Sequence, residues 1–398
     1  MIRSKIDMIQ ATRLTRQGRL AEAMAILRGT GLGDFDSGKA SNNIPHEVEP
    51  RMPTFLDMEW HSRQSNQSRT ARLISEIRSG NVLLQPTGLL KHLLELKHSG
   101  PVDGLFRRGI KPVQPALPDG AKFYDRSFSN NAGTRSYKLY VPSGYRGQPI
   151  PLVVMLHGCT QSPEDFSAGT RMNELAEEQM LLVAYPAQAQ SANASKCWNW
   201  FSSSDQSRDH GEPSLIAGIT REIMRHFSVK AGQVYIAGLS AGGAAAAVMG
   251  ATYPDLYAAV GVHSGLACGA ASDIPSAFTA MREGAQSLRS TRGIPTIVFH
   301  GDADSTVNPR NGDQIIMQGK ANRALTATCN NGEEGGVRYR RKVYRDQAGR
   351  TILEHWVLQN IGHAWSGGSP AGSYTEPRGP DASREMVRFF LEHSVCVR

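Results

Sequence analysis

A glycine–serine–glycine motif between a strand-like and a helix-like segment constrains this 398-residue chain most strongly. Residues 234–237 predict a buried strand, and residues 244–249 predict a helix. Between them stands Gly238-Leu239-Ser240-Ala241-Gly242, the pattern of a sharp turn that lifts a serine hydroxyl clear of a sheet. The helix N-terminus beneath such a turn favours a developing negative charge. The motif predicts a nucleophile, Ser240, although an incidental serine in a glycine-rich turn would show the same residues.

Segments with strand and helix character alternate along the chain from residue 122 onward. Asn130-Asn131-Ala132-Gly133 separates two strand-like segments and predicts a hairpin turn. Apolar strands that alternate with helices are typical of a parallel sheet covered on both faces. We therefore expect an α/β fold, a mostly parallel, doubly wound sheet of the α/β-hydrolase type, over residues 122–398. The expected strands are 123–128, 137–141, 152–156, 181–185, 234–237, 258–262, 296–299 and 355–358, and the expected helices are 163–179, 213–227, 244–249, one that begins near Asn308-Pro309, and 381–392.

Residues 1–121 have a different composition and predict an N-terminal extension, partly helical and partly disordered. Residues 6–28 carry apolar side chains at helical spacing and predict an amphipathic helix. Residues 29–68 are rich in Gly, Ser, Asn and Pro and predict a flexible linker. Residues 73–96 predict short helical segments that either pack on the catalytic domain or bind elsewhere, such as a granule or polymer surface.

The formal net charge of +8 is concentrated near the N-terminus, where residues 1–122 carry 18 Lys and Arg against 12 Asp and Glu. This basic segment has neither a dense Lys/Arg run nor interleaved aromatic residues, so we expect no nucleic-acid partner. No run approaches the roughly 18 apolar residues of a membrane-spanning helix. Arg13, Arg16 and Arg19 interrupt the apolar stretch that a secretory signal would need, which favours a cytoplasmic location.

The cysteines of the chain show no metal-ligand spacing, and we expect no metal site. Their odd number does not indicate a disulfide framework, so unpaired thiols in a reducing compartment are one interpretation. If the protein is exported, one pair can bridge, and we expect Cys197 with Cys268 because both flank loops on the side of the predicted active site. The five cysteines are Cys159, Cys197, Cys268, Cys329 and Cys396.

Two further segments carry the partners that a nucleophilic serine needs. A base must take the proton of the serine, and an acid must hold the tautomer of that base. In hydrolases with this turn, the acid and then the histidine follow the serine along the chain. The strand at 296–299 leads to Asp302 and Asp304, and the last strand leads to His363. We expect Asp302 to tie its loop through backbone amides and Asp304 to reach His363, which completes a triad with Ser240.

Ester cleavage also requires two fixed hydrogen-bond donors for the oxyanion. One is expected to be the backbone N–H of Ala241, directly after the serine. The other is expected to be the backbone N–H of Cys159, which follows a glycine in the loop after the third strand. His157 in the same loop is interpreted as structural. Residues 187–212 and 367–379 are expected to be loops at the carboxyl ends of strands, where such sheets bind ligands.

Five motifs occur together between residues 122 and 393. They are Leu156-His157-Gly158-Cys159-Thr160-Gln161, Cys197-Trp198-Asn199-Trp200-Phe201, Gly238-Leu239-Ser240-Ala241-Gly242-Gly243, His300-Gly301-Asp302-x-Asp304-x-x-Val307 and Gly362-His363-Ala364-Trp365. Together they resemble the poly(3-hydroxybutyrate) depolymerase family of esterases, which includes feruloyl and acetylxylan esterases. The resemblance implies a serine esterase with Ser240 as nucleophile, Asp304 as acid, His363 as base and Cys159 in the oxyanion loop. It also implies an extracellular location as the alternative to the cytoplasm.

The sequence as a whole therefore predicts a serine carboxylic-ester hydrolase that acts on poly(3-hydroxybutyrate) or its oligomers without a cofactor. Trp198, Trp200 and Trp365 are candidate walls of a substrate groove, because aromatic faces offer large contact areas. Packing beneath long loops is the alternative for each of them. The rival functions are a feruloyl or acetylxylan esterase, an acyltransferase with the same triad, and a catalytically silent granule- or polymer-binding protein.

Overall fold

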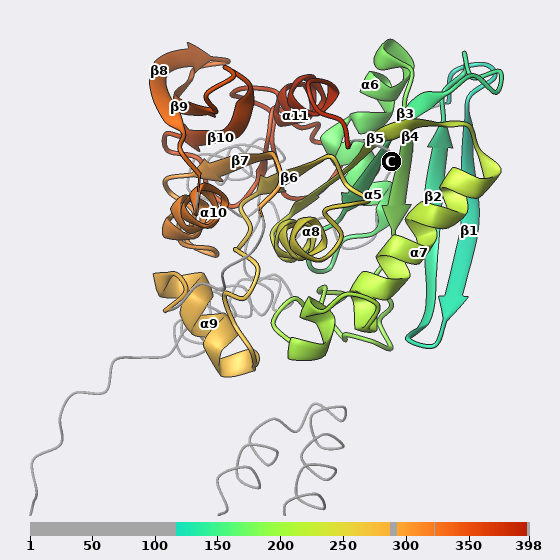
Figure 1. The fold of residues 1–398 in the computed structure, drawn as a ribbon, viewed down its shortest axis with the longest axis horizontal. Helices are drawn as coiled ribbons and strands as arrows, with labels where there is room; N and C mark the ends of the chain where they lie inside the picture. The colour runs from blue at the N-terminus through green and yellow to red at the C-terminus, as the bar shows by residue number, and fades with distance from the viewer. Residues whose placement is uncertain (1–116, 287–292, 322, 396–398) are drawn as a thin grey trace, which may run out of the picture. The chain divides into compact units, whose positions relative to one another are not determined.

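The computed structural model of the protein describes residues 117–286, 293–321 and 323–395 (Figure 1). The helix expected within residues 6–28, the linker at 29–68 and the helical segments at 73–96 lie outside the described residues.

A mixed sheet of ten strands runs through the described part of the chain (Figure 1). Its six central strands pair in parallel, and antiparallel strands extend it at both edges. The predicted α/β-hydrolase fold is thereby confirmed. In spatial order the strands are β1 (Lys122–Asn130), β2 (Gly133–Val141), β4 (Leu182–Pro186), β3 (Ile150–Leu156), β5 (Val229–Leu239), β6 (Ala259–His263), β7 (Thr296–Gly301), β10 (Thr351–Leu358), β9 (Val337–Arg345) and β8 (Thr326–Glu334).

Helices cover both faces of this sheet, because its central strands are apolar on both sides. All seven residues of β3 are buried. Leu152 and Val154 belong to one core, and Val153 and Met155 belong to the other. The first core contains residues of α7 (Gly211–His226), α8 (Ala241–Thr252), α9 (Ile274–Glu283) and α10 (Arg310–Lys320), and the second contains residues of α5 (Pro163–Thr170), α6 (Met172–Gln179) and α11 (Ala382–Leu391).

The observed elements depart from the expected ones in three places. The helix expected over 163–179 is divided into α5 and α6 by Arg171, which adopts a left-handed conformation with φ 56°. The hairpin of β8 and β9, and helix α9, were not expected from the sequence. β8 is exposed along almost its whole length and β9 contains Arg340-Arg341-Lys342, so neither shows the apolar pattern of a buried strand.

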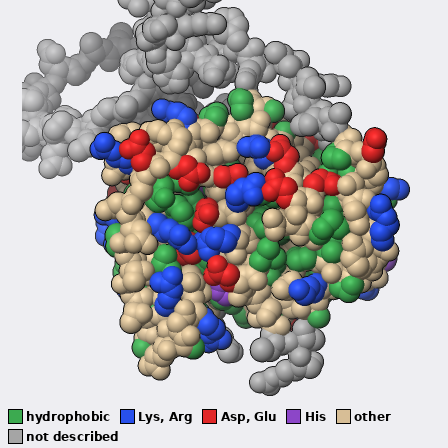
Figure 2. Space-filling model, turned by 90° about the horizontal axis from the view of Figure 1, so that it is seen from above, with side chains coloured by type: hydrophobic (Ala, Val, Ile, Leu, Met, Phe, Trp, Pro, Cys, Tyr) green, Lys and Arg blue, Asp and Glu red, His purple; other side chains and the backbone are tan. Residues whose placement is uncertain are grey.

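The surface of the described residues mixes both signs of charge. Figure 2 shows one face, on which Lys and Arg side chains lie among Asp and Glu side chains. Several of these charges pair, including Arg384 with Glu178 at 2.9 Å and Arg388 with Glu385 at 2.9 Å. Within the ranges that the structure covers, no helix has the length and apolar character needed to cross a membrane.

Three buried histidines make the stability of this fold sensitive to acid. Burial lowers the pKa of His157 to about 4, and that of His263 and of His355 to about 3. A histidine in an unfolded chain has a pKa of about 6.5. Below that pH these three histidines therefore bind protons in the unfolded chain but stay neutral in the folded protein. These groups therefore contribute stability that is present above pH 6.5 and is lost as the pH falls.

We predict that the free energy of unfolding falls between pH 7 and pH 5 by about 2 kcal/mol for each of these histidines. Denaturant titrations at the two pH values measure this change. A His355→Gln variant should show a smaller pH effect, because one titrating group is removed. A stability at pH 5 equal to that at pH 7 would contradict the prediction.

Candidate active site

The turn that carries Ser240 joins the end of β5 to the start of α8. Ser240 has φ 57° and ψ −120°, a strained conformation for a residue with a side chain, and its N–H donates to His263 O at 2.9 Å. A Cβ atom on Gly242 would collide with the carbonyl oxygens of Leu156 and His157. Glycine at position 242 therefore lets the turn pack backbone against backbone on the loop after β3.

Asp304 and His363 meet at the carboxyl ends of β7 and β10. His363 Nδ1 donates to Asp304 Oδ2 at 2.7 Å, and Asp304 Oδ1 accepts from the amides of Thr306 and Val307, both at 2.9 Å. Asp304 is buried, whereas Ser240 and His363 are partly exposed. The arrangement leaves a carboxylate enclosed by the protein and a histidine that solvent and ligands can reach.

Asp302 binds a backbone amide, as expected, but the amide belongs to the neighbouring loop. Asn360 N donates to Asp302 Oδ1 at 2.6 Å, and Asp302 N donates to Leu358 O at 2.9 Å. A Cβ atom on Gly301 would collide with Ile361 O, so this glycine lets the loop that carries His363 pass close to the end of β7. Asp302 thus ties the two loops together, while Asp304 contacts the histidine.

His300 is a neighbour of Asp304 that the sequence analysis did not single out as a site residue. Its Nε2 donates to Val307 O at 2.8 Å and lies 3.4 Å from Asp304 Oδ2. Burial acts to raise the pKa of Asp304, but the hydrogen bonds from His300 and His363 outweigh it and hold that pKa well below its usual range. Asp304 is therefore ionised throughout the neutral and mildly acidic range. The signal in the sequence was the position of His300 in the same motif as the aspartates.

The loop after β3 brings backbone amides next to Ser240. A Cβ atom on Gly158 would lie 3.7 Å from Ser240 Cβ, which places this loop against the serine. The amide of Thr160 donates to Ser195 O at 2.7 Å, whereas no protein acceptor takes the Cys159 amide within the described residues. Ala241 is the first residue of α8, and the first amides of a helix have no helical carbonyl to bind. The two amides suit an anionic ligand.

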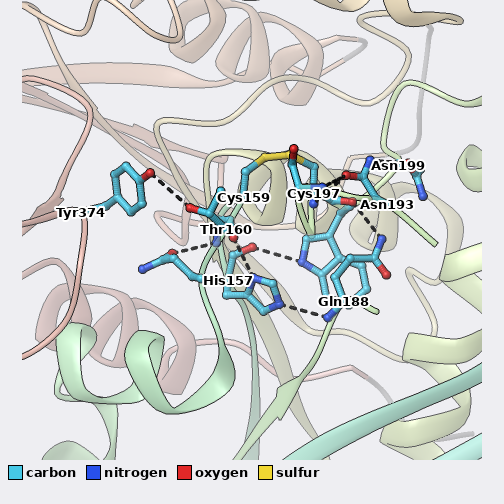
Figure 3. Close-up of a disulfide and its surroundings, with 12 residues drawn as sticks. His157, Cys159, Thr160, Gln188, Asn193, Cys197, Asn199 and Tyr374 are labelled. Atoms are coloured by element: carbon cyan, nitrogen blue, oxygen red, sulfur yellow. Dashed lines mark hydrogen bonds between the residues drawn. A yellow bond between two sulfur atoms is a disulfide. The ribbon is translucent and has the colours of Figure 1, made fainter. Parts of the chain in front are cut away.

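A disulfide joins Cys159 to Cys197, with a Cα to Cα distance of 4.2 Å (Figure 3). The expected pair of Cys197 with Cys268 is wrong, and so is the interpretation of all five cysteines as thiols. The backbone explains the pairing, because the bond between Thr160 and Ser195 already holds the two loops side by side. Cys268 instead lies in the loop after β6, where its carbonyl accepts from Gln318 on α10 at 2.8 Å.

His157 has a structural position, as its interpretation from the sequence proposed. It is buried, its Nδ1 donates to Gly158 O at 2.7 Å, and its Nε2 accepts from Gln188 N at 3.0 Å (Figure 3). Trp198 Nε1 donates to His157 O at 3.1 Å.

Glu212, buried beneath the same loops, accepts from Asn199 N at 2.7 Å and from Gln188. Burial raises the pKa of Glu212.

The three candidate groove tryptophans are buried, with exposed fractions of 0% for Trp198, 6% for Trp200 and 1% for Trp365. Trp365 stacks on His263 and donates from Nε1 to Ser383 Oγ at 3.0 Å. Trp198 and Trp365 therefore pack inside the protein rather than form an open wall.

The described residues contain no group of three or more His, Cys, Asp or Glu side chains that could hold a metal ion.

Comparison with known families identifies the relatives of this chain. The family model described as "Esterase PHB depolymerase" matches residues 135–338. The chain belongs to this family. The match begins within β2, includes the loop after β3, the serine turn and the aspartate loop, and ends before the loop that carries His363.

Individual members of the PHB depolymerase family and related esterases resemble the chain at about 30% identity. Poly(3-hydroxyalkanoate) depolymerase C of Paucimonas lemoignei is 30% identical over 284 residues, which cover 68% of this chain and 66% of that protein. Acetylxylan esterase A of Talaromyces purpureogenus is 26% identical over 50% of this chain and 57% of that protein. Feruloyl esterase B of Neurospora crassa is 29% identical over 48% of this chain and 70% of that protein.

A solved structure supports the same fold. The acetyl xylan esterase from Aspergillus awamori superposes with a TM-score of 0.51 at 18% identity, and the match covers 68% of this chain and 99% of that one. Its sequence is too distant to carry an argument beyond architecture. The two proteins therefore share their overall fold.

We predict that replacing both bridged cysteines, in a Cys159→Ser/Cys197→Ser variant, lowers the free energy of unfolding by about 2–4 kcal/mol, because the unfolded chain loses a cross-link. The bridge spans 38 residues. Denaturant titration without reductant measures the effect, and Cys329→Ser, at an exposed cysteine, is the matched control. Equal stability of the double variant and the control would mean that the bridge does not form.

Proposed function

We propose that the protein is a serine hydrolase of carboxylic esters, with Ser240, Asp304 and His363 as its catalytic triad and residues 122–398 as its catalytic domain. The observation that carries this proposal is the 2.7 Å hydrogen bond from His363 Nδ1 to the buried Asp304 carboxylate. That bond leaves Nε2 of His363 as the nitrogen that can accept a proton. The strained serine turn and membership of an esterase family support the same reading.

The mechanism begins when Ser240 Oγ attacks the ester carbonyl carbon while His363 Nε2 takes its proton. The carbonyl oxygen becomes negatively charged, and the amides of Ala241 and Cys159 donate hydrogen bonds to it. The tetrahedral intermediate collapses as His363 gives its proton to the leaving alcohol, and an acyl group remains on Ser240. Water then attacks this acyl-enzyme while His363 takes its proton; the bond between the acyl carbon and Ser240 Oγ breaks as His363 returns the proton to Oγ, and the acid is released. Asp304 holds the histidine tautomer throughout.

A polymer or oligomer of 3-hydroxybutyrate is the substrate we propose, because a relative that is 30% identical over 284 residues is named a poly(3-hydroxyalkanoate) depolymerase. The acetylxylan and feruloyl esterases among the relatives make an acyl-carbohydrate ester the second candidate. An acyltransferase would use the same acyl-enzyme with an alcohol in place of water. Product analysis in the presence of an alcohol acceptor separates these two reactions.

We predict that the purified protein hydrolyses esters and that Ser240→Ala removes this activity, since the loss of a triad nucleophile typically costs about 10⁶ in kcat. The substrate panel contains short acyl esters, 3-hydroxybutyrate oligomers, feruloyl esters and acetylated xylan. Circular dichroism of the variant serves as the control for folding. A residual rate above roughly 1% of that of the wild type would exclude Ser240 as the nucleophile.

A second prediction compares the two aspartates of one loop. Asp304→Asn keeps the shape of the side chain but favours the wrong histidine tautomer, an effect of about 10⁴ in kcat in the serine-protease example. Asp302→Asn should cost about tenfold or less, because an amide oxygen can still accept from Asn360 N. Measuring kcat of both variants on one soluble ester decides the assignment. A larger loss at Asp302 would show that Asp304 is not the acid of the triad.

A further inference from the structure

Two buried histidine nitrogens beside helix α10 take no part in the mechanism above. His300 Nδ1 and His355 Nε2 are both buried, and neither has a hydrogen-bond partner in the part of the protein that the structure describes. The rings lie on the same face of the sheet. β7 and β10 are parallel neighbours in which His355 pairs with Val298, and His300, two residues after Val298, points to the same side as Val298. Buried polar atoms are almost always paired, so this pair needs an explanation.

His300 Nδ1 and His355 Nε2 both lie against Gly312 of α10. A Cβ atom on Gly312 would lie 3.1 Å from each of these nitrogens. The two nitrogens therefore approach the same point beside a residue without a side chain. A buried water molecule makes two or more hydrogen bonds to polar groups, and these two nitrogens can accept two.

The other nitrogen of each ring indicates where the protons are. His300 Nε2 lies 2.8 Å from Val307 O, a carbonyl that can only accept, so Nε2 carries a proton and Nδ1 is the nitrogen that can hold a lone pair. His355 Nδ1 lies 3.7 Å from the carboxylate of Asp313, which favours a proton on Nδ1 and a lone pair on Nε2. Burial, His300 and the basic Lys342 and Arg340 of β9 lower the pKa of His355 to about 3, which keeps that ring neutral.

Two lone pairs that approach the same point require a ligand with two donors. The described residues provide no third metal ligand there, which makes a cation a poor fit. A water molecule can donate one hydrogen to each nitrogen. In that position it would fix His300 as an Nε2–H donor, directed at Val307 O and at the Asp304 carboxylate 3.4 Å away.

We propose that His300 is a positioning residue for Asp304, and that one buried water molecule shared by His300 Nδ1 and His355 Nε2 locks the His300 tautomer. His300 then holds the loop through Val307 O while it shares the negative charge of Asp304 Oδ2 with His363. This inference deepens the proposed esterase function and rests on it. The two can nevertheless be tested separately, because the water is observable without any assay of activity.

The kinetic test replaces His300 by Leu, which removes both ring nitrogens, and by Gln, whose amide can still donate near the Nε2 position. We expect His300→Leu to lower kcat on a soluble ester by about 10- to 100-fold with little change in KM, since a hydrogen bond to a charged group is lost. His300→Gln should recover most of this loss. The matched control is His393→Leu, a histidine hydrogen-bonded to Phe389 O and Thr351 O away from the triad.

The pH profile separates positioning of the carboxylate from general packing. Without His300, only His363 contacts Asp304 Oδ2, and the stronger interaction with this carboxylate raises the pKa of His363. The acidic limb of the plot of kcat against pH should therefore move toward higher pH by about half a unit. Loss of packing alone would lower the rate without moving the limb. A His300→Leu enzyme with kcat within about twofold of the wild type and the same acidic limb would overturn the proposal.

A crystal structure tests the water directly, whatever the substrate is. We expect one ordered water within about 3 Å of both His300 Nδ1 and His355 Nε2 in the wild type, and its displacement by the methyl group in Gly312→Ala. A wild-type crystal structure at high resolution without density between these nitrogens would overturn the bridging water. If the wild-type enzyme cleaves no ester, the proposed function fails, and the water is then judged by this structure alone.

Discussion

Contact of backbone with backbone between the serine turn and the end of β3 is the constraint on which the candidate site depends. The two strands β3 and β5 are parallel neighbours, so Gly242 and the carbonyl groups of Leu156 and His157 meet without a side chain between them. Any Cβ atom at Gly242 would push the turn away from the loop. Since that loop carries the Cys159 amide, the same contact sets the distance between Ser240 and the amide that we propose as an oxyanion donor.

The second half of the site depends on how two loops from β7 and β10 are tied together. Gly301 permits close approach, Asp302 binds the Asn360 amide, and Ala303 N donates to Ile361 O at 3.1 Å. Once these backbones are fixed, the short side chain of Asp304 needs no adjustment to reach His363. The hydrogen bond from His363 to Asp304 is thus a product of backbone geometry, and His300 lies 3.4 Å from the same carboxylate oxygen.

The sequence predicted the features that depend on local patterns and on strand order. Ser240 stands at a turn that its flanking glycines define, and Asp304 and His363 follow apolar strands whose carboxyl ends must share one edge of the sheet. The partner of Cys197 was missed because it depends on how the short loop after β3 and the long loop after β4 pass one another, which no local pattern encodes. The burial of Trp198 and Trp365 was unresolved because it too depends on how loops pack. His300 was missed because its contact with Asp304 depends on how the loop between them turns.

The exposed strand β8 also matters for how the molecule meets other copies of itself. A sheet edge presents unpaired backbone groups that can recruit a strand from another chain, and natural proteins blunt such edges with polar and charged side chains. β8 forms one edge of the large sheet, and its sequence Thr326-Ala-Thr-Cys-Asn-Asn-Gly-Glu-Glu334 is mostly small or polar. The small and polar residues of β8, which do not show the apolar pattern of a strand, therefore also disfavour the addition of a strand from another molecule at that edge.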